Sequence, residues 1–399
     1  MTPSPESEIV LGCVRAVVGG GPPPRALTDG RALNWERLLQ CAAANTVAPL
    51  LHHCLAANGL DAHVPADCRD RLSRAYYRVA VMNARHLAEL VVVLRTFNRI
   101  RTPVIVLKGA ALAEHVWRNP AVRIMADIDL LVPEAHLDQA ARAITALGYR
   151  PDTRYRPARW YRREHHHLPP FRKQGDWFVV EVHHGLVRPR APFSLGVDAL
   201  WKRARAGAFG GAPARVLCPE DFLVHLCLHL AVDEPFVGRI RDLADVAMLL
   251  RQHRGRLNWR RIADEARRGG YAGRLYYALD AAAAILAAPV SAPALRALQR
   301  TAGAGAGRAA LTKAFIRRHI LADHDTPAVP AWVLQEVCGA LLAEEPAGLA
   351  LVRLLARLHA PADDDPASGA GRWSRAGRMA VKSAARRLAL RTRSEVRTP

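Results

Sequence analysis

The chain has 399 residues, half of them hydrophobic, and a formal net charge of +21. This length exceeds one ordinary hydrophobic core, so two or three domains are expected, and seven scattered cysteines exclude a disulfide framework. Because only five of the 57 basic residues are lysine, we attribute part of the charge to an arginine-rich composition, and a nucleic-acid partner has only weak support.

The N-terminal third of the chain predicts helices. Apolar residues recur at three- and four-residue intervals in residues 35–43 and 80–93, so residues 1–99 are expected to form a helical region. The first residues lack a basic segment followed by an apolar one, and the most apolar stretch, 281–288, is too short to span a bilayer. We therefore expect a cytoplasmic protein without a transmembrane segment.

A turn between a strand and a helix is predicted next. Residues 101–107 are rich in β-branched and apolar residues, and residues 110–117 predict a helix. Lys108 and Gly109 connect the two. The first N–H groups of a helix are unpaired, so this turn could bind an anion, with Lys108 adding positive charge. The alternative is a structural turn in which Gly109 only supplies a positive φ.

Two aspartates follow in a second predicted strand, residues 127–132. Side chains at i and i+2 of a strand share a face, so Asp127 and Asp129 would present two carboxylates side by side. Like charges this close are tolerated when a hard cation lies between them, and Mg²⁺ takes oxygen ligands. The pair predicts a Mg²⁺ site, with Mn²⁺ as the alternative ion. Two solvated aspartates at a strand end are the other interpretation.

A third acid is available in residues 179–183, where valines alternate with Glu181 and His183. The two polar side chains would share one face of a strand, and a charged residue in an apolar strand requires a partner. A metal ion is one candidate. An edge strand with its polar face in water is the alternative.

The remaining histidines are weaker candidates for metal binding. His165, His166 and His167 are consecutive, and consecutive residues on an extended strand cannot all face one ion, so a transition-metal site is not favoured there. His225 and His229 lie one helical turn apart, which fits either two metal ligands or a hydrogen-bonded pair in a helical core.

The C-terminal half is predicted to be helical. Within it, Asp242 and Asp245 lie beside Arg239 and Arg241 and could line a cleft or pair locally. Residues 361–371 resemble an acidic linker, and residues 371–399 contain nine Lys or Arg against one acid. This tail is expected to be flexible, although it could also form an amphipathic helix on an anionic surface.

Three segments together carry a family resemblance. They are Leu107-Lys108-Gly109-Ala110-Ala111-Leu112, then Arg123 with residues 127–132, and then Glu181-Val182-His183. The pattern resembles the uncharacterised nucleotidyltransferase family of the polymerase-beta-like superfamily, most strongly over residues 100–186. The broader superfamily usually carries Gly-Ser where this chain has Lys108-Gly109, so a hydroxyl that would meet a phosphate is replaced by a lysine.

The resemblance implies an α+β fold, with a small mixed nucleotidyltransferase sheet flanked by helices and with helical N-terminal and C-terminal regions. The corresponding domains are an N-terminal helical region at 1–99, a catalytic domain at 100–215, a C-terminal helical domain at 216–360, and the linker and tail at 361–399.

The same resemblance implies residue roles and a reaction. Catalysis and Mg²⁺ binding would fall to Asp127, Asp129 and Glu181, and the nucleotide would be bound by Lys108, Gly109, Arg123 and His183. Arg123 could instead be an ordinary surface arginine. The implied reaction transfers a nucleoside monophosphate from a nucleoside triphosphate, ATP being the first candidate, to a small molecule, a peptide or protein, or RNA, with release of pyrophosphate. The alternative is a catalytically inactive nucleotide-sensing or protein-interaction module on the same fold.

Overall fold

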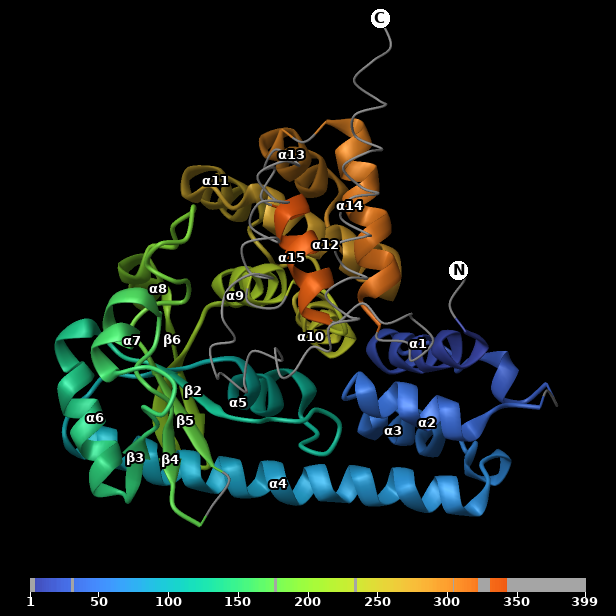
Figure 1. Cartoon of the computed structure of the whole chain (residues 1–399), viewed down its shortest axis with the longest axis horizontal. Helices are drawn as coiled ribbons and strands as arrows, with labels where there is room; N and C mark the ends of the chain where they lie inside the picture. The colour runs from blue at the N-terminus through green and yellow to red at the C-terminus, as the bar shows by residue number, and fades with distance from the viewer. Residues whose placement is uncertain are drawn as a thin grey trace, which may run out of the picture.

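The computed structural model describes residues 4–29, 32–175, 178–232, 235–303, 305–321 and 331–342. The linker and tail expected at 361–399 lie outside these residues, as does the end of the C-terminal helical region. Within the described residues the predicted fold class is confirmed, because helices surround one mixed sheet of seven strands (Figure 1).

The N-terminal region is helical. A 34-residue helix, α4, runs along the lower edge of Figure 1 and passes beneath both the sheet and the smaller N-terminal helices. Its buried positions include Leu72, Val79, Leu90 and Phe97, a spacing that keeps one apolar stripe facing the core. The helices of this region are α1 (Pro5–Gly19), α2 (Trp35–Ala44), α3 (Ala48–Ala57) and α4 (Ala66–Arg99), with short 3₁₀ turns at Arg25–Leu27 and Asp61–His63.

The sheet has the strand order β3-β4-β5-β2-β1-β7-β6. Its pairs β2–β5 and β1–β7 are parallel, and the other neighbours are antiparallel. The central strands β1 and β2 are fully buried and, apart from Asp129, apolar, as expected for a sheet covered by helices. The strands are β1 (Ile105–Val106), β2 (Ile128–Leu131), β3 (Tyr149–Pro151), β4 (Phe171–Lys173), β5 (Val179–His183), β6 (Arg205–Phe209) and β7 (Ala212–Val216).

The strand expected at 101–107 is shorter than predicted. Only β1 is regular, since Arg101 has a φ of 54° and Pro103 has no N–H to donate. Hydrogen bonding continues on both sides of β1, with the Val104 carbonyl accepting from the Arg215 N–H and the Leu107 N–H donating to the Asp129 carbonyl. The helix expected at 110–117 begins earlier, as α5 (Lys108–Leu112), and ends in a π-helical turn, Ala113–Trp117.

Helices complete the rest of the described chain. Around the sheet lie α6 (Leu137–Ala146), preceded by a 3₁₀ turn at Glu134–His136, α7 (Ala158–Glu164) and α8 (Val197–Arg203). In Figure 1, α9 and α10 lie between the sheet and the outer C-terminal helices. These helices are α9 (Pro219–Val232), α10 (Ile240–Gln252), α11 (Trp259–Gly269), α12 (Ala272–Leu286), α13 (Ala292–Ala302), α14 (Ala306–His319) and α15 (Ala331–Leu342).

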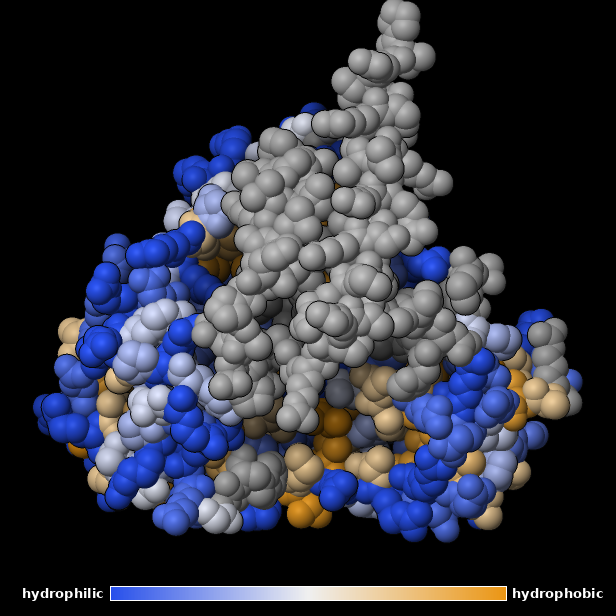
Figure 2. Space-filling view, in the orientation of Figure 1, coloured by the Kyte–Doolittle hydropathy of each residue, from blue (hydrophilic) through white to orange (hydrophobic). Residues whose placement is uncertain are grey.

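The surface and the helices of the described part agree with the composition. Figure 2 shows hydrophilic residues over most of the described surface on the side of the sheet. Among the described residues, no helix combines the length and the apolar character needed to cross a membrane.

Candidate active site

Two parallel strands bring the predicted carboxylates together. Asp129 on β2 and Glu181 on β5 are paired Cα positions, and Leu131 and His183 are the pair two residues later. Because side chains alternate along a strand, all the polar members of these pairs share one face of the sheet. Asp127 directly precedes β2, so the structure places all three predicted acids at the same edge.

The loop before β2 is held by the long helix α4. The buried side chain of Asn83 donates hydrogen bonds to the carbonyls of Pro120 and Arg123 and accepts one from the Met125 N–H at 3.2 Å. This buried amide therefore fixes the backbone that leads to Asp127. Sequence reasoning missed Asn83, although a polar residue within the apolar stripe of a helix is a usable signal.

Asp129 is the centre of the site. It is 1% exposed, and its Oδ1 atom accepts from Lys108 Nζ at 3.0 Å and from His183 Nε2 at 2.8 Å. These contacts with Lys108 and His183 outweigh the effect of burial and hold the pKa of Asp129 well below its ordinary value. Its Oδ2 atom has no hydrogen-bond partner among the described residues. A buried carboxylate oxygen without a partner is costly, and a cation would satisfy it.

Glu181 lies beside two imidazoles. Its Oε2 atom is 3.5 Å from His183 Nε2 and 3.7 Å from His167 Nε2. Burial raises the pKa of Glu181, but His183 and His167 together hold it below its ordinary value. Ligand atoms of Asp129, Glu181 and His183 all lie within 4.8 Å of one another. Such a group of oxygen and nitrogen atoms can bind a divalent cation.

Asp127 has the opposite electrostatic environment. Burial, together with the negative charges of Asp129 and Glu181, raises the pKa of Asp127 to about 7, although Lys108 and Arg123 oppose the increase. Two neighbouring acids whose pKa values are shifted in opposite directions are typical of functional sites. Because Asp129 and Glu181 both raise the pKa of Asp127, a cation bound among the three acids would relieve their mutual repulsion.

The turn between β1 and α5 is tightly packed. Lys108 has a φ of 36°, a strained backbone conformation for a residue with a side chain. A Cβ atom on Gly109 would lie 3.1 Å from Arg123 Nη1 and 3.2 Å from Met125 Cγ. Gly109 is therefore needed for close approach by Arg123 and Met125, and Lys108 is directed at Asp129 by the same turn.

Arg123 is buried rather than exposed to solvent. Its Nε and Nη2 atoms contact the carboxylate of Asp245 at 2.9 Å, and Nη1 donates to the Ile124 carbonyl. Trp117 Nε1 also donates to Asp245, at 2.7 Å. Asp245 thus connects α10 to the π-helical turn at Trp117 and, through Arg123, to the loop before β2. The sequence left two interpretations of Asp245 open, a residue that lines a cleft and a local pair with a neighbouring arginine. The structure instead pairs Asp245 with Arg123, which is distant in the sequence.

The histidines of α9 separate into two environments. His225 is buried, and burial together with the positive charge of Lys108 holds its pKa well below the ordinary value, so it is a neutral group next to the site. His229 instead contacts Arg239, whose guanidinium also binds Asp242. Among the described residues, neither His225 nor His229 belongs to a group of three or more possible metal ligands.

The expectation for His165, His166 and His167 is wrong in its geometry. The chain bends at His165 and His166 after the end of α7, and His167 then pairs with His183 of β5, so the ligand atoms of the three histidines converge to within 4.8 Å of one another. The rings of His166 and His183 are 5.3 Å apart, and those of His167 and His183 are 5.2 Å apart. The three histidines therefore extend the site along β5.

Comparison with known proteins gives one result. No curated protein and no solved structure matches the chain. A family model, that of an uncharacterised nucleotidyltransferase, matches residues 31–287, which include the helices α2 to α12 and the whole sheet. The match covers well over half of the chain, together with the turn at Lys108 and all three carboxylates, and the chain therefore belongs to the uncharacterised nucleotidyltransferase family.

Proposed function

We propose that this protein is a Mg²⁺-dependent nucleotidyltransferase that transfers a nucleoside monophosphate from a nucleoside triphosphate to an acceptor. The observation that carries the proposal is the unsatisfied, buried Oδ2 atom of Asp129 within a group of three carboxylates. A purely structural charge cluster would be expected to satisfy this oxygen. Family membership supports the same reaction class.

The metal ligands in this proposal are Asp127, Asp129 and Glu181. Carboxylate oxygens suit Mg²⁺, and Mn²⁺ would be accepted by the same oxygens together with an imidazole. When bound, the ion would neutralise charge on the transferring phosphoryl group and on the leaving pyrophosphate. His183 holds Asp129 through its Nε2 atom and so orients one of these carboxylates.

The nucleotide would be bound by the turn after β1. Lys108 supplies a positive charge that can move from Asp129 to a phosphate oxygen, and Gly109 lets Arg123 and Met125 pack closely against the turn. Arg123 lies against this turn, and its guanidinium is held in place by Asp245. His183 lies on the same face and completes the predicted nucleotide-binding set.

The reaction is an in-line displacement. An acceptor oxygen attacks the α-phosphorus, the bond from that phosphorus to the bridging β-oxygen breaks, and pyrophosphate leaves with the electron pair. The acceptor proton passes to a carboxylate or imidazole of the site or to water. Cysteines at all seven positions are free and buried, and we propose a cytoplasmic location on that basis.

Thermal stabilisation by nucleotides is the test of this proposal. Each of the four nucleoside triphosphates, beginning with ATP, would be added with and without Mg²⁺ to the wild type, to Asp127→Asn and to the exposed control Asp70→Asn. A ligand at about 100 times its Kd stabilises the native state by about 2.7 kcal/mol. We expect a Mg²⁺-dependent shift that Asp127→Asn loses and Asp70→Asn keeps. A shift that persists in Asp127→Asn, or needs no metal, contradicts the metal site.

A further inference from the structure

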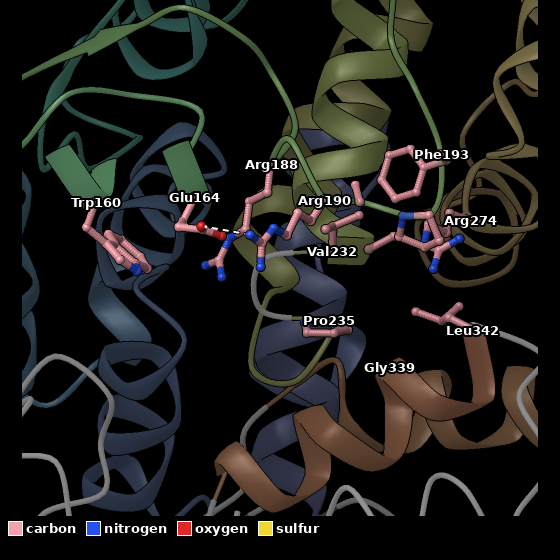
Figure 3. Close-up of a pocket in the computed structure, with 13 residues that line it drawn as sticks. Trp160, Glu164, Arg188, Arg190, Phe193, Val232, Pro235, Arg274, Gly339 and Leu342 are labelled. Atoms are coloured by element: carbon pink, nitrogen blue, oxygen red, sulfur yellow. Dashed lines mark ion pairs between the residues drawn. The ribbon is translucent and has the colours of Figure 1, made fainter. Parts of the chain in front are cut away.

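A basic cavity lies beyond the C-terminal end of β5, separate from the candidate site. It has a volume of about 360 Å³ and is lined by residues of α7, of the loop after β5 and of the C-terminal helices (Figure 3). Cavities of this size typically hold small molecules rather than folded macromolecules.

The cavity carries an excess of positive charge. Its charged lining, within the described residues, is Glu164, Arg188, Arg190 and Arg274. Glu164 pairs with Arg190 at 3.0 Å, whereas Arg188 forms no ion pair with any described residue. Figure 3 shows Arg188 and Arg190 beside Glu164, and Arg274 beside Phe193. Guanidinium groups match the oxygens of phosphate and carboxylate groups, so this lining suits an oxyanion.

Flat apolar surfaces accompany the arginines. Phe193 is buried and lies 4.7 Å beneath the Arg274 guanidinium, and Trp160 lines the same cavity. An aromatic face fixes the plane of a guanidinium stacked on it. A ligand with an anionic end and an apolar body would fit both features.

Backbone hydrogen bonds at the end of β5 connect the carboxylate site with segments that lead to the cavity. The Leu168 N–H donates to the Val182 carbonyl, and the His184 N–H donates to the His166 carbonyl, so residues 166–168 pair with the end of β5. Glu164 lies just before the first of these segments, and Arg188 lies a few residues after the second. Both paired segments therefore continue into residues that line the cavity, Glu164 on one side and Arg188 on the other.

Helix α9 connects the surroundings of Lys108 with the wall of the cavity. It carries His225 next to Lys108 and ends with Val232 in the cavity wall. Seven residues of α-helix span about 10 Å, so the part of α9 next to Lys108 and the cavity wall at Val232 are about that far apart. A ligand anchored by the arginines would therefore need an extended shape to reach the site.

We propose that this cavity is the acceptor-binding site, and that it binds an elongated small-molecule acceptor by a terminal phosphate or carboxylate while the acceptor hydroxyl reaches the carboxylate site. This inference rests on the proposed function and names its acceptor class. In the reaction, the hydroxyl oxygen bonds to the α-phosphorus, the bond to the β-bridging oxygen breaks, and pyrophosphate leaves.

A series of synthetic acceptors tests the proposal. The probes are ω-hydroxyalkyl phosphates of increasing length, the matching ω-hydroxy carboxylates, and neutral diols. Each is assayed as an acceptor for nucleotidyl transfer, with the nucleoside triphosphate that gives the largest thermal stabilisation. We expect the anionic probes long enough to span about 10 Å to react best, and Arg188→Ala to lower their kcat/KM by about tenfold or more. The same variant should leave transfer to the diols unchanged, and the exposed control Arg69→Ala should change neither.

Two results overturn the proposal. One is equal transfer to diols and to anionic probes in the wild type. The other is an equal loss for both kinds of probe in Arg188→Ala, which would indicate a structural role. The comparison of phosphates with carboxylates identifies which oxyanion the cavity prefers.

Anion binding without turnover separates this proposal from the proposed function. Inorganic phosphate would be titrated by thermal stabilisation at constant ionic strength, with saturating ATP and Mg²⁺ and without them, in the wild type, Arg188→Ala, Arg69→Ala and Asp127→Asn. We expect phosphate to bind in every protein except Arg188→Ala, whether or not ATP is present. Phosphate binding that ATP abolishes, or that Arg188→Ala retains, contradicts the proposal. Phosphate binding without any nucleotide effect would refute only the proposed function.

Discussion

Asp129 and Glu181 occupy paired positions on adjacent parallel strands, and their side chains share His183 as a neighbour. Parallel pairing in this register places the two acids side by side on one face of the sheet. Asp129 is enclosed by Lys108 and His183, while Asp127, just before the strand, has no comparable partner among the described residues. The two aspartates are therefore expected to respond differently to substitution.

Asp127→Asn is expected to remove metal binding and leave the protein as stable as the wild type or more stable, because it relieves repulsion among three acids. Asp129→Asn is expected to cost about 3 kcal/mol in the free energy of unfolding, because Lys108 loses its buried partner. Urea denaturation of the metal-free proteins measures both values. Equal destabilisation by the two substitutions would contradict the difference in their environments.

The metal-free protein is expected to lose stability as the pH rises toward 7. The pKa of Asp127 is about 7 in the folded chain, against about 3.9 for an unfolded aspartate. The folded state then binds the proton more tightly, so this contribution is complete below about pH 4 and is lost as the pH rises through 7. Asp127→Asn should match the wild type at pH 4 and exceed it at pH 8, measured by denaturation in chelator. A constant difference between the two proteins would contradict the raised pKa.

The helical and apolar patterns explain why much of the fold could be predicted. The alternation around Glu181 is a local property, and it correctly indicated that Glu181 and His183 lie together. The i, i+2 spacing likewise predicted that Asp127 and Asp129 are neighbours, and their charges interact in the structure. The length of β1 was not predicted, because the positive φ of Arg101 and the fixed φ of Pro103 interrupt a β-prone sequence. The roles of the site residues remain predictions.

Contacts between distant segments could not be predicted. Arg123 and Asp245 are 122 residues apart, so no local pattern could distinguish this pairing from the local one that Asp242 makes with Arg239. His167 was misjudged for a different reason. Consecutive side chains of a regular strand point to opposite faces, but the chain bends at His165 and His166 after α7, so the neighbouring imidazoles converge.

Lys108 is expected to combine a backbone effect with a charge effect. Because its φ is 36°, Lys108→Gly should be more stable than Lys108→Ala by about 1 kcal/mol, although both remove the same ammonium group. Both variants should lose nucleotide stabilisation and bind Mn²⁺ at least as tightly as the wild type, since a cation next to Asp129 is removed. Denaturation and Mn²⁺ titration by electron paramagnetic resonance measure these effects. Unchanged nucleotide affinity would reduce Lys108 to a structural turn residue.

The pair formed by Arg123 and Asp245 is expected to be strongly coupled. Both side chains are buried, so removing one leaves an uncompensated charge, and Arg123→Met or Asp245→Leu should each cost about 3–5 kcal/mol. The double variant should cost clearly less than the sum, because neither charge remains. Denaturant unfolding of the four proteins measures the coupling, and fully additive losses would show that the contact contributes nothing specific.

The exposed pair Arg71–Glu36 provides the matched control for this cycle, and its coupling should be close to zero because water screens both groups. Arg123 also lies against the Gly109 turn, and Asp245 accepts from Trp117. The double variant should therefore shift Trp117 fluorescence and weaken nucleotide stabilisation even where its stability recovers. Recovery of both stability and nucleotide binding would show that the pair serves only to hold α10 in place, and that its positive charge is not used at the turn.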